Sequence, residues 1–434
     1  MVPHSTPIPD HESTRPSAPP DHRNPLPPPS TMRPPRGNAL IGQSGGPTAV
    51  INQSLVGLVE ECLASEEIQN VYGALNGIEG IMDERLVNLG LEEPRVLQRV
   101  AETPCAALGS VRHKPTLEDC ERLLEVMKAH DVRYFFYIGG NDSAETAHLL
   151  NQVAVDSGYD LRLFHVPKTI DNDLRETDHC PGYGSAAKFV AQAVAGDNED
   201  NRSLGGVKID VIMGRNAGWL TAAAALARCG EGEGPHLIYL PEVDFEWDAF
   251  LGDVSDVMER HGRCVIAASE GIHDPDGELI SRPAEIDAFG NAQLSGSGSL
   301  GDILRERVKA GLGNGTRVRA DTFGYLQRSF FGCVSEQDAT EARAVGHAAV
   351  RTAVCGERPH GSAIIERCDE DGSYRPAYGC VDLELVARHT KDLPTEFLDG
   401  THDVSEAFLA YVRPLVGPLP AAGRLARYPV PRRL

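Results

Sequence analysis

The sequence has no pair of cysteines in the C-x-x-C spacing, although it contains 10 cysteines. This absence argues against a zinc ribbon and against a disulfide framework, and it favours the reduced thiols of a cytosolic protein. No run of about 18 apolar residues occurs, so we expect no membrane span. The N-terminal residues also lack the apolar segment of a secretory signal, and we therefore expect a cytoplasmic location.

Positive charge is scarce as well. Lysine and arginine number 41 against 63 aspartates and glutamates, which gives a formal net charge of −22. A chain this acidic is not expected to bind nucleic acid, because the two polyanions repel each other. A site for a smaller anionic ligand would need a local cluster of arginine and lysine side chains.

The composition and hydrophobic pattern of the chain change after its first 36 residues. Residues 1–36 are rich in proline and poor in apolar side chains, so we expect a disordered tail, with a ligand for a proline-recognising domain as the alternative. From Asn38 onward, short apolar runs alternate with amphipathic segments, which is typical of parallel α/β sheets. The expected strands are 38–42, 133–140, 162–169, 207–214, 236–242 and 263–271.

Ligands of open α/β sheets bind where the strands end, so the residues after each expected strand are the informative ones. Gly45 and Gly46 follow the first strand in QSGGPTAVINQ, where glycines permit close backbone approach and the next helix offers N–H groups to an anion. The loop matches neither the G-x-G-x-x-G nor the G-x-x-x-x-G-K-[ST] motif. Taken alone, it is more typical of a simple tight turn.

Amide and acidic side chains follow two further strands. Asn141 and Asp142 lie in GGNDS, which alone is typical of a capped turn. In PKTIDND, Asp171 and Asp173 are two residues apart, so they point to the same side of an extended segment, with Lys168 close by. Two carboxylates and a lysine suit a general base, a metal ligand and a phosphate partner, whereas a solvated polar loop is the alternative.

The missing positive charge is found in the remaining loops. Guanidinium groups are permanently charged and match phosphate oxygens in geometry. We therefore predict an anion-binding cluster of arginines at the strand ends, near the carboxylate in SEG and the tyrosine in GYLQR. These residues are Arg112 in LGSVRHK, Arg215 in MGRNAGW, Glu270 in SEG, and Arg319, Tyr325 and Arg328 in RADTFGYLQR.

As a set, GGNDS, PKTIDND, MGRNAGW, SEG and GYLQR resemble the 6-phosphofructokinase family in order and approximate spacing, over about residues 37–416. The resemblance implies two Rossmann-like three-layer αβα domains with mostly parallel sheets and an active site in the cleft between them. Residues 37–180 would bind the donor and be completed by part of 325–434. Residues 181–324 would bind the sugar phosphate.

The resemblance also implies roles at the matching positions. Gly45, Gly46 and Arg112 match the donor-phosphate site. Asp171 matches the general base that takes the proton from the sugar 1-hydroxyl, and Asp173 matches an acidic residue near Mg²⁺, the implied cofactor. The implied substrate-binding residues are Thr169, Ile170, Asp171, Met213, Gly214, Arg215, Glu270, Arg319, Tyr325 and Arg328.

Two of these positions bear on the donor. ATP-using members of the family resemble GGDGS and PGTIDND, whereas pyrophosphate-using members resemble GGDDS and PKTIDND. This chain has Asp142 and Lys168. The Asp142 carboxylate would repel the α-phosphate of a nucleotide, and Lys168 would hold the pyrophosphate leaving group. The resemblance therefore implies reversible transfer from pyrophosphate to fructose 6-phosphate, with Asp171, Lys168 and Asp142 in the catalytic set.

Three positions depart from the family pattern. Asn141 replaces an aspartate associated with magnesium, and its amide oxygen remains a possible Mg²⁺ ligand. Tyr325 replaces the histidine of ATP-type members and keeps a hydrogen-bond donor. Gly206 replaces an arginine that crosses to the neighbouring subunit, a role that Lys208 or Arg202 would have to take over.

The same resemblance leaves alternative functions open and implies that the chain forms a homo-oligomer. An ATP-dependent 6-phosphofructokinase and a pyrophosphate-dependent kinase for sedoheptulose 7-phosphate are the alternative enzymes, and a sugar-phosphate sensor is the non-enzyme alternative. Arg319 matches an arginine that reaches the 6-phosphate from a neighbouring subunit, beside Tyr325 and Arg328. We therefore expect a homodimer or homotetramer.

Overall fold

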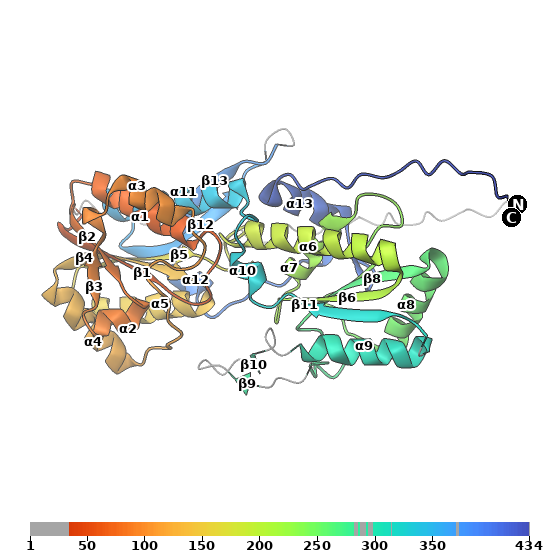
Figure 1. Cartoon of the computed structure of the whole chain (residues 1–434). Helices are drawn as coiled ribbons and strands as arrows, with labels where there is room; N and C mark the ends of the chain where they lie inside the picture. The colour runs from red at the N-terminus through yellow and green to blue at the C-terminus, as the bar shows by residue number, and fades with distance from the viewer. Residues whose placement is uncertain are drawn as a thin grey trace, which may run out of the picture.

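The computed structural model describes residues 34–281, 285–286, 292–293, 298–313, 315–369 and 373–433. Most of the proline-rich segment, residues 1–33, lies outside the described residues. The structure therefore does not test the expectation that this segment is disordered. Two large sheets lie side by side in Figure 1, each with helices on both faces.

The first sheet has seven strands in the order β13–β12–β5–β4–β1–β2–β3. They are β1 (Gly37–Gln43), β2 (Ile68–Ala74), β3 (Leu86–Asn88), β4 (Val132–Gly139), β5 (Arg162–Pro167), β12 (His360–Arg367) and β13 (Pro376–Val381). The five central strands run parallel, and the edge strands β3 and β13 pair antiparallel. Along β4, Tyr134 and Phe136 belong to the core on one face, and Phe135 and Tyr137 to the core on the other.

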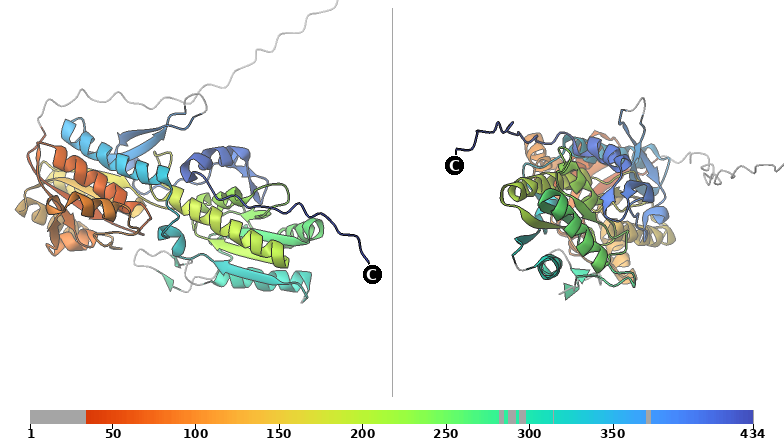
Figure 2. Two further views of the ribbon diagram at one scale, coloured as in Figure 1. Left: turned by 45° about the horizontal axis from the view of Figure 1, so that its top comes forward. Right: turned by 90° about the vertical axis from the view of Figure 1, so that its right-hand side faces the viewer.

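Helices from distant parts of the chain cover this first sheet. One face carries α1 (Ile51–Ala64), α3 (Pro94–Ala101) and α11 (Glu336–Cys355). The other carries α2 (Gly77–Met82), α4 (Leu117–Ala129), α5 (Asn141–Asp156) and α12 (Leu383–Val386). Although α1 and α11 are far apart in sequence, they lie against each other in Figure 1 and in the left view of Figure 2.

The second sheet has four parallel strands in the order β11–β6–β8–β7. They are β6 (Gly206–Ile212), β7 (Leu237–Tyr239), β8 (Arg263–Ser269) and β11 (Val318–Thr322). One face packs against α6 (Tyr183–Leu204), α7 (Trp219–Ala222) and α13 (Glu406–Val416), and the other against α8 (Trp247–His261) and α9 (Ser299–Leu312). The short elements are η1 (Leu89–Leu91), η2 (Ala223–Ala227), β9 (Glu285–Ile286), β10 (Ala292–Gln293), α10 (Leu326–Ser329), η3 (Thr395–Phe397), β14 (Leu398–Asp399) and β15 (Asp403–Val404).

The predicted fold class is confirmed: both sheets are mostly parallel and lie between helical layers. All six predicted strands form, as β1, β4, β5, β6, β7 and β8. Among the strands of the two large sheets, β2, β3, β11, β12 and β13 were not predicted. Strand β13 is only half-buried and β2 is buried at scattered positions, so no clear apolar run marks these two. Within the described residues, no helix is long and apolar enough to cross a lipid bilayer.

The contact between α1 and α11 predicts one measurable effect on stability. A Cβ atom added at Gly57 in α1 would lie 2.2 Å from the Arg343 carbonyl oxygen in α11. We expect Gly57→Ala to lower the free energy of unfolding by about 1–3 kcal/mol, because two packed backbones would have to separate. Gly252→Ala in α8 is the matched control, since nothing lies within 4 Å of its added Cβ and alanine favours the helix. Denaturant unfolding would contradict the packing argument if the two variants had the same midpoint.

Candidate active site

A cleft of about 330 Å³ opens where the strands of the two sheets end. Each of β1, β4, β5, β6 and β8 leads directly into residues that line it, as does the segment after β11. The lining residues are Ser44, Gly45, Gly46, Pro47, Thr48, Arg112, Gly140, Asn141, Asp142, Ser143, Lys168, Thr169, Ile170, Asp171, Asp173, Met213, Arg215, Asn216, Glu270, Tyr325, Arg328 and Thr390. The cleft therefore gathers every site residue predicted from the sequence except Gly214 and Arg319.

The two exceptions have different positions. Gly214 is buried beside the cleft, with a positive φ of 145°, and its carbonyl accepts a hydrogen bond of 2.5 Å from Ser269. Arg319 is exposed on β11, the edge strand of the second sheet, and its guanidinium donates to the Val318 carbonyl at 3.0 Å. Arg319 is thus outside the cleft of its own chain.

Lys168 connects the end of β5 to the glycine loop after β1. Its side chain is buried, and its ammonium donates to the Gly46 carbonyl at 2.6 Å. A Cβ atom added at Gly45 would lie 3.3 Å from this ammonium. A Cβ atom added at Gly46 would lie 2.8 Å from the Arg328 guanidinium. The positive φ of 73° at Gly45 favours glycine there, whereas at Gly46 an added Cβ would meet the flexible end of Arg328, which can move aside.

Burial and neighbouring positive charge lower the pKa of Lys168. Loss of hydration, together with the positive charges of Arg328 and Arg112, lowers the pKa of Lys168 to about 7, although Asp171 opposes the shift. Burial and the charge of Arg112 also lower the pKa of Arg328, whose guanidinium stacks 4.4 Å from the centre of the Tyr325 ring. This end of the cleft therefore gathers positive charge that an entering anion would stabilise.

The two carboxylates after β5 have raised pKa values. Burial raises the pKa of Asp171, against the opposing charges of Arg215 and Lys168. Burial and the charge of Asp171 raise the pKa of Asp173 to about 7. Asp171 is held by Thr169, whose hydroxyl donates to the carboxylate at 3.4 Å and accepts from the Asp171 N–H at 3.1 Å. A carboxylate with a raised pKa and a fixed orientation is suited to accept a proton.

Asn141 begins α5 next to this acidic pair. Its amide nitrogen donates to Asp173 Oδ2 at 3.0 Å, and its amide oxygen is buried with no hydrogen-bond partner in the described structure. An orphaned amide oxygen beside a carboxylate is a hard oxygen donor set of the kind that binds Mg²⁺.

The sequence interpretation missed seven lining residues. They are Ser44, Pro47, Thr48, Gly140, Ser143, Asn216 and Thr390. All but Thr390 are close neighbours of predicted residues, so their position in the motifs was a usable signal. Thr390 comes from a segment far downstream and reaches the cleft through a β-bridge to Leu174, which no local pattern indicates.

Lys208 and Arg202, the candidates to replace the family's arginine at the position of Gly206, both form ion pairs within this chain. Gly206 has a positive φ of 82°, and an added Cβ would lie 2.3 Å from the Arg317 carbonyl. Lys208 is buried and forms ion pairs with Asp321 and, at 3.2 Å, with Asp197. Arg202 pairs with Glu233 at 2.6 Å.

The model of the Phosphofructokinase family matches residues 38–353 of this chain. The chain belongs to the phosphofructokinase family. It is 50% identical over 396 residues to a pyrophosphate–fructose 6-phosphate 1-phosphotransferase of Rhodospirillum rubrum, which covers 90% of this chain and 97% of that protein. A protein of the same name from Xanthomonas campestris is 43% identical and covers 88% of this chain and 91% of the relative.

A solved structure agrees with these relatives. The pyrophosphate-dependent phosphofructokinase of Nitrosospira multiformis superposes with a TM-score of 0.79 at 34% identity, covering 92% of this chain and 98% of the other. The family predicted from the motifs is therefore confirmed, and the similarity extends over both sheets.

The low pKa of Lys168 predicts a pH dependence of anion binding. Below pH 7 the ammonium is charged and attracts pyrophosphate, and above pH 7 binding must first restore its proton. Between pH 7 and 9 we expect the affinity for pyrophosphate to fall by up to about 10-fold per pH unit more in the wild type than in Lys168→Met. Isothermal titration calorimetry measures this difference, with the exposed Lys128→Met in α4 as the control. Parallel pH profiles for the wild type and Lys168→Met would contradict it.

Proposed function

We propose that this family member transfers a phosphoryl group from inorganic pyrophosphate to the 1-hydroxyl of fructose 6-phosphate, forming fructose 1,6-bisphosphate and phosphate. The observation that carries the proposal is the buried Lys168 ammonium inside the glycine loop of the cleft. The names of the relatives from Rhodospirillum rubrum and Xanthomonas campestris support the same donor and acceptor. The transfer is reversible in principle, since pyrophosphate and a sugar phosphate ester are both phosphoryl donors.

The donor end of the cleft is assigned to the cations around the glycine loop. Lys168 and Arg112 would bind the pyrophosphate oxygens, and the Gly45–Gly46 backbone would lie against them without side chains. Asp142 is exposed in the first turn of α5, where its carboxylate would repel the additional phosphate of a nucleotide. This placement favours pyrophosphate over ATP.

Asp171 is assigned as the general base. Phosphoryl transfer passes through a loose transition state, so alignment and charge neutralisation matter more than base strength. Thr169 fixes the orientation of the Asp171 carboxylate, which would take the proton of the sugar 1-hydroxyl as the new P–O bond forms. The sugar phosphate is assigned to Arg215, Met213, Gly214 and Glu270 from the second sheet, with Ile170, Tyr325 and Arg328, and with Arg319 from a neighbouring subunit.

Mg²⁺ is the proposed cofactor. Asn141 Oδ1 and the Asp173 carboxylate are the residues that would hold it. The chemistry that Mg²⁺ supplies when it is bound is neutralisation of charge on phosphate oxygens. A cation beside Asp173 would also favour the ionised form of this carboxylate, whose pKa is otherwise raised to about 7.

Two further assignments concern the setting of the enzyme. All ten cysteines are free thiols, which supports a cytoplasmic location. The donor domain is proposed to comprise residues 37–180 with strands β12 and β13 and helix α11, and the sugar-phosphate domain residues 181–324. Helix α13 packs on the second sheet, so the C-terminal segment serves both domains.

An assay of the purified protein tests the function. We expect turnover of fructose 6-phosphate with pyrophosphate and Mg²⁺, little or none with ATP, and a preference for fructose 6-phosphate over sedoheptulose 7-phosphate. Asp171→Asn should lower kcat by roughly 10²–10⁴-fold while sugar-phosphate binding persists, which ties the activity to this cleft. Equal rates with ATP would refute the donor assignment, and a faster reaction of sedoheptulose 7-phosphate would refute the acceptor.

The proposed homodimer or homotetramer has a separate test. Arg319 is exposed on an edge strand and outside its own cleft, which suits a phosphate contact made across a subunit interface. Loss of one charge-assisted contact should raise the KM of Arg319→Ala for fructose 6-phosphate by roughly 10- to 100-fold. Arg317→Ala, just before the same strand, is the control. A fully active monomer by light scattering, or an unchanged KM, would show that the site is not shared.

A further inference from the structure

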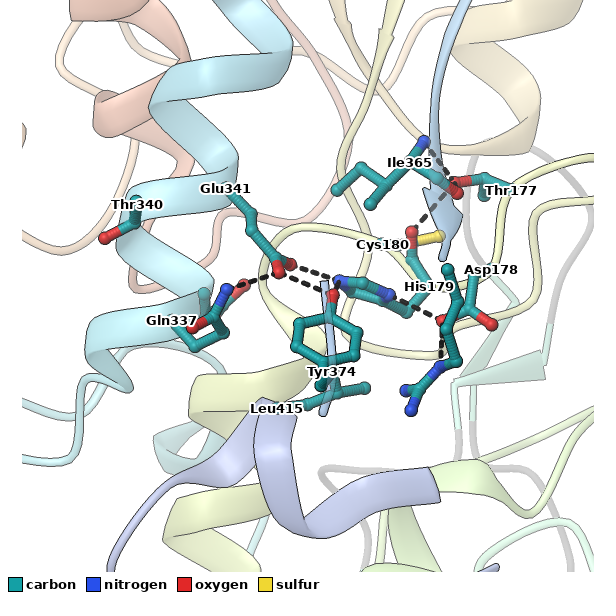
Figure 3. Close-up of polar contacts among 12 residues, drawn as sticks. Thr177, Asp178, His179, Cys180, Gln337, Thr340, Glu341, Ile365, Tyr374 and Leu415 are labelled. Atoms are coloured by element: carbon teal, nitrogen blue, oxygen red, sulfur yellow. Dashed lines mark hydrogen bonds and ion pairs between the residues drawn. The ribbon is translucent and has the colours of Figure 1, made fainter. Parts of the chain in front are cut away.

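Behind the loop that carries Asp171 and Asp173 lies a buried ionic cluster (Figure 3). Its centre is His179, whose side chain is 2% exposed. His179 Nδ1 lies 2.8 Å from Asp178 Oδ2, and Nε2 forms a hydrogen bond with Glu341 Oε2 of α11, which is itself buried. A histidine between two carboxylates can satisfy both only as an imidazolium, because the neutral ring has one N–H donor.

The surroundings of His179 favour this charged form. Burial opposes the charge, but the hydrogen bonds with Asp178 and Glu341 outweigh it and raise the pKa of His179 to about 9. Glu341 also accepts hydrogen bonds from the Tyr374 hydroxyl at 2.5 Å and the Gln337 amide at 2.7 Å. Arg367 Nε forms an ion pair with Asp178 Oδ2 at 3.4 Å, and the Lys391 ammonium donates to the Asp178 carbonyl at 2.7 Å. Arg367 and Lys391 therefore supply the other positive charges of the cluster.

The cluster is connected to the acidic pair through Asn172. This residue lies between Asp171 and Asp173 and has a left-handed φ of 58°. Its amide nitrogen donates to the Tyr411 hydroxyl of α13 at 3.0 Å, and its amide oxygen accepts from the Cys180 N–H at 2.9 Å. The Tyr411 hydroxyl in turn donates to the Asp178 carbonyl at 2.9 Å. A displacement of residues 178–180 would therefore move Asn172, and with it both carboxylates.

We propose that His179 is a positioning residue for phosphoryl transfer: as the cation that joins Asp178 to Glu341, it fastens the turn 178–180 to α11 and so fixes Asp171 for proton acceptance. His179 does not line the cleft, so its effect must be on turnover rather than on substrate contact. The inference rests on the proposed function, which assigns Asp171 as the general base.

The test compares Glu341→Gln and His179→Gln with the wild type from pH 6.5 to 10, at saturating substrates. In the wild type, kcat should fall as the pH rises through about 9, because neutral His179 keeps only one of its two donors. Glu341→Gln removes one carboxylate, so this limb should move about one pH unit or more to lower pH. His179→Gln should abolish the limb and lower kcat by roughly 10-fold or more, with KM values changed by less than about 3-fold, since a small misplacement of a reacting group affects turnover first.

A surface pair supplies the matched control. His130 Nε2 lies 2.9 Å from Glu84 Oε2, and both side chains are partly exposed, far from the cleft lining. His130→Gln should leave kcat and its pH profile unchanged. If Glu341→Gln does not fold, Glu341→Asp keeps the charge at greater distance and should move the limb in the same direction.

The outcomes are separable. An unshifted alkaline limb in the folded Glu341 variant, or a lower thermal stability of His179→Gln with unchanged kcat, would reduce His179 to a structural role and overturn the proposal. A wild type that uses ATP and not pyrophosphate would overturn the proposed donor instead. The same comparison would then be made with ATP, because the network acts on Asp171 whichever donor is bound.

Discussion

The hydrogen bond from the Lys168 ammonium to the Gly46 carbonyl joins the loop after β5 to the loop after β1. Gly45 has a left-handed φ of 73°, which favours glycine, and an added Cβ there would lie 3.3 Å from the Lys168 ammonium. This hydrogen bond also places a charged side chain in a buried position at the end of a parallel sheet, away from water. The lowered pKa of Lys168 is the measurable result, and the favourable entry of a phosphate anion is the functional one.

The local cation cluster reconciles an acidic protein with anionic substrates. With a net charge of −22, the chain as a whole repels phosphates, and screening confines useful attraction to about 10 Å. Lys168 and Arg215 follow the ends of β5 and β6, whereas Arg112 comes from the loop after α3 and Arg328 from α10, and all four meet in one cleft. The carboxylates of Asp171 and Asp173 line the same cleft as these cations.

The acidic loop is supported differently on its two sides. Toward the cleft, Asp171 and Asp173 have raised pKa values, and they accept hydrogen bonds from Thr169 and Asn141 respectively. Away from the cleft, Asp178, His179 and Glu341 form a compensated ionic cluster with defined hydrogen bonds. The proposed role of Asp171 needs a fixed position, and the hydrogen bonds behind the loop are the contacts that would hold it there.

The sequence by itself determined the parallel α/β class, six of the strands and 15 of the 22 residues that line the cleft, since apolar runs and the residues that follow them are local features. The tertiary structure decided what depends on distant segments. Strands β12 and β13 and helix α11 return to the first sheet from the C-terminal part of the chain, Thr390 reaches the cleft across a bridge to Leu174, and Glu341 meets His179 from 162 residues away. The charge of His179 is likewise a property of the fold, because it exists only where two carboxylates from different elements are buried against one ring.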